Sequence, residues 1–306
     1  MRKRAIMVLI VLLLSPPGVW ARAEDQLPLR ARPPQWSADV VEVFFEDSRK
    51  HLAGDRPTRE PAVSPAAATT SEATDLQGDT KWSALIEAGA LTVEVKSVLN
   101  RLISLLARAG SFKSGGNADC RREFSLLAVL FGVVDQYDQE IRWQQQAVRM
   151  RALCTQAAHA CETASDESFA LAADVHSQIA DLLRGQSMSR QTPAAEAPID
   201  RGQLMQRMEL AVEENISPWL ANRKEFRRRK SDVAHESQLL AVLARTIRRE
   251  GYDFADDETF VEIARQLGRA SRELTEASEQ GNYEAAQQAI GRVTQSCSDC
   301  HDGYRG

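Results

Sequence analysis

Apolar side chains recur every three or four residues through two long stretches of this chain, and that spacing constrains the fold more than any other feature. Such spacing gathers the apolar residues on one face of a helix, which can then be buried against other helices. Each stretch contains four segments of this kind, separated by polar turns. The sequence therefore predicts an all-α protein. The expected helices span residues 82–109, 120–137, 139–163 and 168–183 in the first stretch and 201–229, 233–249, 257–278 and 283–304 in the second.

Segments that are poor in large apolar residues divide the chain. Residues 56–78 are rich in Pro, Ala, Thr and Ser and cannot bury enough surface to offset the entropy lost on ordering. A second gap, around Pro193 and Pro198, separates the two helical stretches. We therefore expect an N-terminal segment and flexible linker over residues 24–79, a four-helix bundle over 80–185, a linker over 186–198 and a second four-helix bundle over 199–306.

A short internal similarity relates the two bundles. Residues 123–130 read EFSLLAVL and residues 236–243 read ESQLLAVL, and each segment falls on the expected second helix of its bundle. Short connections make successive helices antiparallel. Together with the shared helix order, the similarity indicates two tandem copies of one antiparallel four-helix bundle.

The first 23 residues have the parts of a secretory signal peptide. Three basic residues at positions 2–4 precede an apolar run over residues 5–14, and Ala-Arg-Ala follows at positions 21–23 as a cleavage pattern. The apolar run is much shorter than the roughly 20 residues of a membrane-spanning helix, which favours a cleaved signal peptide over a retained anchor. We therefore expect a periplasmic or otherwise extracytoplasmic protein, without membrane insertion once residues 1–23 are removed.

The charge of the chain argues against a nucleic-acid partner. The formal net charge is -5 at pH 7, so the chain lacks the basic field that holds a phosphate backbone. One basic run, RRRK at residues 227–230, follows the expected first helix of the second bundle. We interpret this run as a solvated helix end that balances the negative C-terminal dipole, with a docking patch for an acidic redox partner as the alternative.

The sequence CSDCH at residues 297–301 carries the clearest chemistry. Cys297 and Cys300 are one helical turn apart, so both sulfurs can reach the two vinyl groups of one haem while His301 presents its imidazole to the iron. A thioredoxin-like redox pair would need a βαβ pattern, and zinc would need a second pair of ligands. A structural disulfide would leave His301 without a role. The motif therefore predicts one covalently attached haem c.

Three cysteines lie outside this motif. Cys154 and Cys161 are two turns apart on one expected helix, about 10.5 Å along its axis, which is too far for a disulfide. An antiparallel hairpin would bring Cys120, at the start of the second helix, closest to Cys161, at the end of the third. We therefore favour a disulfide between Cys120 and Cys161, with three buried thiols as the alternative.

The segment 260–305 closely resembles the C-terminal half of cytochrome c′, the family of class II cytochromes c. The resemblance rests on GNYEAA before the last helix and on CSDCHDGYR at its end. It covers residues 200–306 well, and residues 80–185 only through the internal similarity. The family fold implies an antiparallel four-helix bundle with haem on its final helix. The first bundle has no C-x-x-C-H motif, so we expect it to be a degenerate, haem-free copy.

The resemblance also implies roles for single residues. His301 would be the proximal iron ligand, and Arg305 would lie near the haem. In the family, an Arg on the first helix is followed four positions later by the residue that faces the iron, and Arg201 and Met205 have this spacing. Met208, one turn further on, is the alternative ligand. The third alternative is that neither methionine binds iron and both fill the core.

The sixth ligand decides between two functions. A methionine thioether on the iron gives a six-coordinate, low-spin haem that suits electron transfer, whereas an open position binds nitric oxide or another small gas. We expect an electron carrier that works with an unidentified redox partner protein and is not an enzyme, and a homodimer stays an open alternative. A gas-binding haem protein is the second hypothesis, and a haem-free interaction module is the third.

Overall fold

The computed structural model describes residues 81–186 and 199–304, which all belong to one compact unit spanning Thr70–Gly306. The predicted signal peptide over 1–23, the N-terminal segment over 24–79, nearly all of the linker over 186–198, and Arg305 lie outside the described residues. Every regular element within the two described ranges is a helix, which confirms the all-α prediction. None of these helices is long and apolar enough to cross a membrane.

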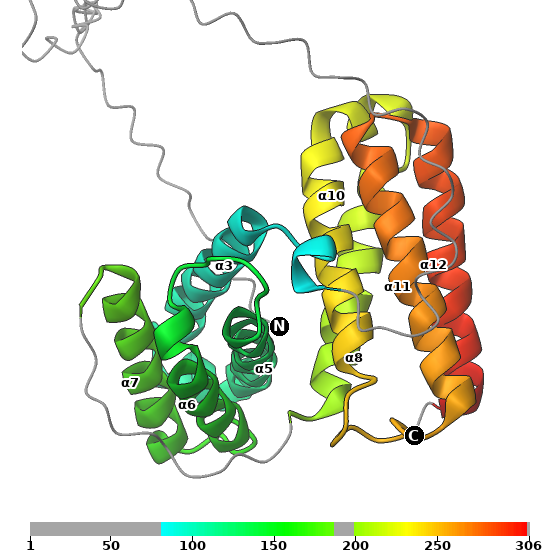
Figure 1. The fold of residues 1–306 in the computed structure, drawn as a ribbon. Coiled ribbons are helices and arrows are strands. Elements are labelled where there is room, and N and C mark those ends of the chain that lie inside the picture. Colours follow the sequence, from blue (N-terminus) through cyan, green and yellow to red (C-terminus); the bar gives the residue numbers. More distant parts are fainter. Residues whose placement is uncertain (1–80, 187–198, 305–306) are drawn as a thin grey trace, which may run out of the picture. The chain divides into compact units, whose positions relative to one another are not determined.

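Four longer helices form a first helix group in residues 81–186 (Figure 1). α5 is its central helix, since it packs against α3 and α6, and α6 in turn packs against α7. Every residue from 123 to 134 on α5 is buried, as expected for a helix that is apolar on all sides. The group consists of α3 (Ala88–Leu105), α5 (Asn117–Asp135), α6 (Ala147–Ala160) and α7 (Asp166–Leu183), with the short elements η1 (Trp82–Ala84), α4 (Ala109–Ser111), η2 (Phe112–Gly116) and η3 (Gln144–Gln146).

A second helix group follows in residues 199–304 (Figure 1). α10 packs against α11, and α11 packs against α12. Gly281, with a positive φ of 69°, makes the turn between α11 and α12. The group consists of α8 (Arg201–Leu210), the π-helical stretch η4 (Ala211–Ile216), α9 (Ser217–Trp219), α10 (Arg223–Thr246), α11 (Glu258–Glu279) and α12 (Tyr283–Tyr304).

The boundary between the first two helices of this group differs from the prediction. The expected helix over 201–229 is wrong, because the chain turns after α9 and α10 already begins at Arg223. The side-chain oxygen of Asn222 accepts hydrogen bonds from the backbone N–H groups of Lys224 and Glu225, both at 3.0 Å, and this cap starts the new helix. Pro218 therefore lies close to a helix end and does not merely kink a longer helix.

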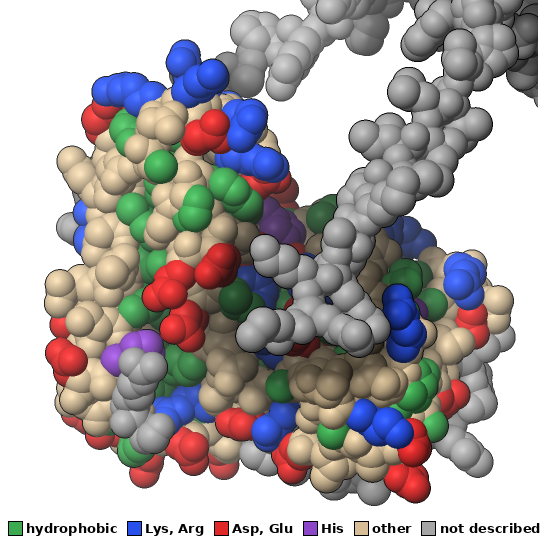
Figure 2. Space-filling view, turned by 180° about the vertical axis from the view of Figure 1, so that it is seen from behind, with side chains coloured by type: hydrophobic (Ala, Val, Ile, Leu, Met, Phe, Trp, Pro, Cys, Tyr) green, Lys and Arg blue, Asp and Glu red, His purple; other side chains and the backbone are tan. Residues whose placement is uncertain are grey.

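The basic run at residues 227–230 consequently lies near the N-terminal end of α10 and not at the C-terminal end of a helix. The interpretation that these residues balance a negative helix end is wrong for this reason. All four side chains are exposed. Figure 2 shows Lys and Arg side chains gathered at the end of the second helix group where α10 begins.

The third helix of the first group is shorter than predicted. The helix expected from residue 139 begins at Ala147, because the preceding residues form turns. Trp143 has a positive φ of 68°, which a helix cannot contain. The helix expected from residue 82 is also shorter, because α3 begins at Ala88 after the short element η1. The other ends agree with the sequence prediction within about four residues, and α12 spans the predicted range 283–304.

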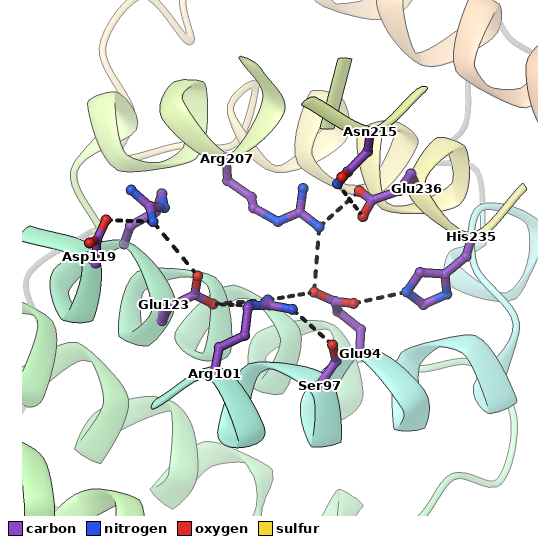
Figure 3. Close-up of polar contacts among 10 residues, drawn as sticks. Glu94, Ser97, Arg101, Asp119, Glu123, Arg207, Asn215, His235 and Glu236 are labelled. Atoms are coloured by element: carbon purple, nitrogen blue, oxygen red, sulfur yellow. Dashed lines mark hydrogen bonds and ion pairs between the residues drawn. The ribbon is translucent and has the colours of Figure 1, made fainter. Parts of the chain in front are cut away.

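A buried network of charged side chains joins the first helix group to the second (Figure 3). Glu94 on α3 has a side chain that is 3% exposed, accepts a hydrogen bond from Arg101 at 3.0 Å and lies 3.5 Å from Arg207 on α8. Nε2 of His235 on α10 is 2.9 Å from the other carboxylate oxygen of Glu94. Arg207 also donates to Glu236 on α10 at 2.9 Å. These contacts hold α3, α8 and α10 together.

The environment of Glu94 stabilises its ionised form. Burial by itself would raise the pKa of this carboxyl group, but the hydrogen bond with His235 and the charges of Arg207 and Arg101 outweigh burial and lower the pKa to about 2. The ionised carboxylate can only accept hydrogen bonds, so Nε2 of His235 carries the hydrogen.

We predict that the contribution of Glu94 to stability depends on pH. The pKa in the folded chain lies below the ordinary value of 4.5, so the ionised group stabilises the fold above that pH, and the stabilisation is lost as the pH falls from 4.5 towards 2. Glu94→Gln should lower the free energy of unfolding by about 3 kcal/mol near neutral pH, and by roughly half as much near pH ~3. Urea unfolding of both proteins at the two pH values measures this difference.

Glu276→Gln is the matched control, because Glu276 is exposed on α11 and should change stability by less than about 0.5 kcal/mol at either pH. An effect of Glu94→Gln that is equally large at both pH values would show that Glu94 does not carry the pH dependence.

Candidate functional site

A cavity of about 280 Å³ lies in the second helix group, between α8 and the C-terminal half of α12. It brings together residues that are nearly a hundred positions apart in the sequence, since α8 supplies Met205 and Met208 while α12 supplies Cys297, Cys300 and His301. The rest of the wall comes from α8 and η4, from the end of α10, from α11 and from α12, namely Glu209, Val212, Glu213, Ile247, Ile263, Ala264, Leu267, Thr294, Ser296 and Ser298.

The two predicted sixth ligands differ in burial. Met208 is 4% exposed and belongs to the core, whereas Met205 is half-buried and packs against the core from its edge. Both methionines line the cavity that His301 also lines, so the cavity does not distinguish between them.

The two motif cysteines lie half-buried in the cavity wall. Burial, and after it the nearby Cys300 and Glu213, raise the pKa of the Cys297 thiol to about 11. Burial also raises the pKa of Cys300, although the charge of Arg201 opposes this. A thioredoxin-like redox cysteine has a lowered pKa, so this environment does not resemble that of a thiol-exchange pair. Two adjacent sulfurs and an imidazole beside an apolar wall form a donor set that fits a covalently bound haem.

Arg201, at the start of α8, supplies the clearest sign of a missing anionic group. Its guanidinium lies over the rings of Phe254 and Phe260, 4.7 Å and 5.4 Å from their centroids, and its Nη2 donates a long hydrogen bond of 3.4 Å to the carbonyl oxygen of Tyr304. Its Nη1 is buried and has no hydrogen-bond partner among the described residues. A buried, unsatisfied charged donor is costly, and a haem propionate would satisfy it. Arg201 therefore fits its predicted place near the haem.

The C-terminal end of α12 is anchored to the start of α11. The hydroxyl group of Tyr304 donates to Oδ1 of Asp257 at 3.0 Å, and the same carboxylate caps α11 by accepting from the N–H groups of Thr259 and Phe260. The ring of Tyr304 also packs against Phe254, at a centroid distance of 5.1 Å. These contacts fix the part of α12 that carries Cys300 and His301.

The anchor is not apparent from the sequence, which predicts no site role for Asp257, Phe254 or Phe260. Phe254 is 42% exposed and has a positive φ of 64°, in a turn whose conformation helical periodicity does not describe. The tyrosine three residues after the motif histidine was the one local signal for a contact at this end of α12.

His176, Cys120 and Cys161 lie in the first helix group, outside the cavity. Nε2 of His176 lies 3.2 Å from the carbonyl oxygen of Leu99. Cys120 and Cys161 are fully buried, and neither is in a disulfide. Burial is the main cause that raises the pKa of both thiols to about 12, and proximity to Cys161 contributes to the rise at Cys120. Asn117 donates to the carbonyl oxygen of Cys161 at 3.0 Å, so the start of α5 does lie beside the end of α6. The disulfide stays a prediction.

Comparison with known proteins addresses the second helix group. The family model for cytochrome c′ matches residues 201–305, which include α8, the whole cavity wall and α12. No curated protein and no solved structure matches the chain. The match confirms the resemblance that the end of the sequence indicates and implies binding of haem c. Residues 201–305 of this chain are therefore similar to cytochrome c′, a family of c-type haem proteins.

Proposed function

We propose that this chain is an extracytoplasmic cytochrome that transfers electrons through one haem c, attached through Cys297 and Cys300, and that it transforms no substrate. The observation that carries the proposal is the shared cavity, in which the cysteines and His301 on α12 stand in one wall with the methionines of α8 in another. A bound haem would supply a metal that gains and loses one electron. An iron with two protein ligands needs a donor atom from each of two sides, and α12 and α8 would supply them.

The residues of the chain would control that electron transfer in three ways. His301 would hold the iron from the side of α12, and a thioether from α8 would hold it from the opposite side. Apolar residues such as Ile263 and Leu267 would exclude water from the haem faces. Arg201 would balance the charge of a propionate, which affects the reduction potential.

The organisation of the chain supports the same proposal. We infer that the two helix groups are tandem four-helix bundles and that the first carries no haem, because residues 80–185 contain no C-x-x-C-H motif. The predicted signal peptide over residues 1–23 supports export to a compartment such as the periplasm, and the cytochrome c′ match agrees with export. The partner would be another redox protein.

We predict that haem attachment depends on the two motif cysteines. Intact-mass spectrometry of the denatured wild-type chain should show the polypeptide plus one haem, and a denaturing gel should stain for haem-linked peroxidase activity. Both signals should be absent from the Cys297→Ala/Cys300→Ala variant, because no thioether can form. Cys120→Ala is the control and should keep the added mass, since Cys120 lies in the first helix group. A wild-type chain at its bare mass would contradict the proposed function.

We predict that Met205 is the sixth ligand and that Met205→Ala converts a low-spin haem into a high-spin one. Met208→Ala removes the same side chain from the same cavity wall and should leave the low-spin spectrum in place, which makes it the matched control. Absorption and electron paramagnetic resonance spectra of the oxidised and reduced proteins measure the spin state. The reverse pattern would assign Met208, and a wild-type protein that is already high-spin and binds nitric oxide would support gas binding in place of electron transfer.

A further inference from the structure

α8 separates the haem cavity from the charged network that joins the two helix groups. At 3.6 residues per turn, Met208 and Glu209 lie within about 60° of Met205 around the helix axis, and all three line the cavity. Arg207 lies about 200° from Met205, so it points away from the cavity. Its side chain is 6% exposed and reaches the carboxylates of Glu94 and Glu236.

The position of Arg207 is determined by groups on two other helices. Its Nη2 donates to Glu236 of α10 at 2.9 Å and lies 3.5 Å from Glu94 of α3, while its Nη1 is buried without a partner among the described residues. A buried guanidinium that lost one of these carboxylates would keep an uncompensated charge. Rotating or sliding α8 is therefore costly as long as both carboxylates stay in place.

The two carboxylates are themselves held firmly (Figure 3). Glu94 is bound on its other sides by His235 at 2.9 Å and by Arg101 at 3.0 Å. Nδ2 of Asn215 donates to Glu236 at 3.1 Å. Each acceptor of Arg207 thus has a second partner that fixes its orientation, and Glu94 transmits the position of the first helix group to α8.

We propose that Arg207 is a positioning residue through which the first helix group sets the place of the cavity-lining methionines on α8. The proposal rests on the proposed haem function, and it gives the haem-free helix group a role in tuning the haem. Glu94 holds Arg207, Arg207 fixes the rotation of α8, and that rotation decides how closely a thioether approaches the iron. A purely structural role would affect stability without affecting the haem ligands.

The test compares two neutralised carboxylates of the same network. Glu94→Gln weakens the contact with Arg207 and keeps the shape of the side chain. Glu123→Gln is the matched control, because Glu123 is buried and pairs with Arg101 at 3.0 Å but is not a partner of Arg207. The readouts are the spin state of the oxidised haem, the reduction potential, and hydrogen–deuterium exchange of residues 201–210.

We expect Glu94→Gln to raise the high-spin fraction at least about twofold and to speed amide exchange in residues 201–210 about tenfold, because α8 opens more readily. Glu123→Gln should leave the spin state and the exchange of this segment at the wild-type values. Arg207→Met should reproduce the effect of Glu94→Gln, and Arg207→Lys, which keeps the charge, should restore part of the low-spin signal.

Wild-type spin state, potential and exchange in a folded, haem-loaded Glu94→Gln protein would overturn the proposal. Equal effects of Glu94→Gln and Glu123→Gln would also overturn it, because they would show a general loss of stability. Exchange is measured as well on the Cys297→Ala/Cys300→Ala background, where no haem is attached. A wild-type chain without haem contradicts the proposed function. If Glu94→Gln leaves the exchange of residues 201–210 unchanged on the haem-free background, the positioning role is contradicted. The two failures are therefore distinguishable.

Discussion

The buried guanidinium of Arg207 is the constraint on which the arrangement of this protein depends. A charge removed from water costs several kcal/mol unless carboxylates surround it, and Glu94 and Glu236 supply them from α3 and α10. Apolar helix faces tolerate small shifts against one another, but ion pairs with fixed partners do not. The network therefore specifies one arrangement of α3, α8 and α10, and the apolar packing supplies most of the stability.

That arrangement also shapes the functional site. With one face of α8 held by charges, its other face presents Met205 and Met208 to a cavity that α12 closes with Cys297 and His301. Tyr304 and Asp257 fix the end of α12, and Arg201 stands beside them with a buried nitrogen that lacks a partner. Both sides of the cavity are thus held by contacts outside the cavity itself, α8 through Arg207 and α12 through Tyr304.

The helices show where local reasoning succeeds. The start of α12 agrees with the prediction because the turn at Gly281 precedes it, and the fold class follows from helical periodicity. The first boundary in the second helix group differs from the prediction because the N-cap at Asn222 starts a new helix, and only its capping hydrogen bonds reveal that start. Around Trp143 the chain makes turns that helical periodicity does not reveal, so the helix expected from residue 139 begins only at Ala147.

The sequence by itself determined the all-α class and the haem motif, because both depend on spacing within one helix, where the backbone fixes the distance between neighbours. It also indicated Met205 and Met208 through a resemblance in spacing. Only the tertiary structure decided that these residues share a cavity with Cys297, and that Glu94 meets Arg207 and His235. Charged residues at helical spacing look like a solvated face in any sequence, and their burial is decided by which other helix covers them.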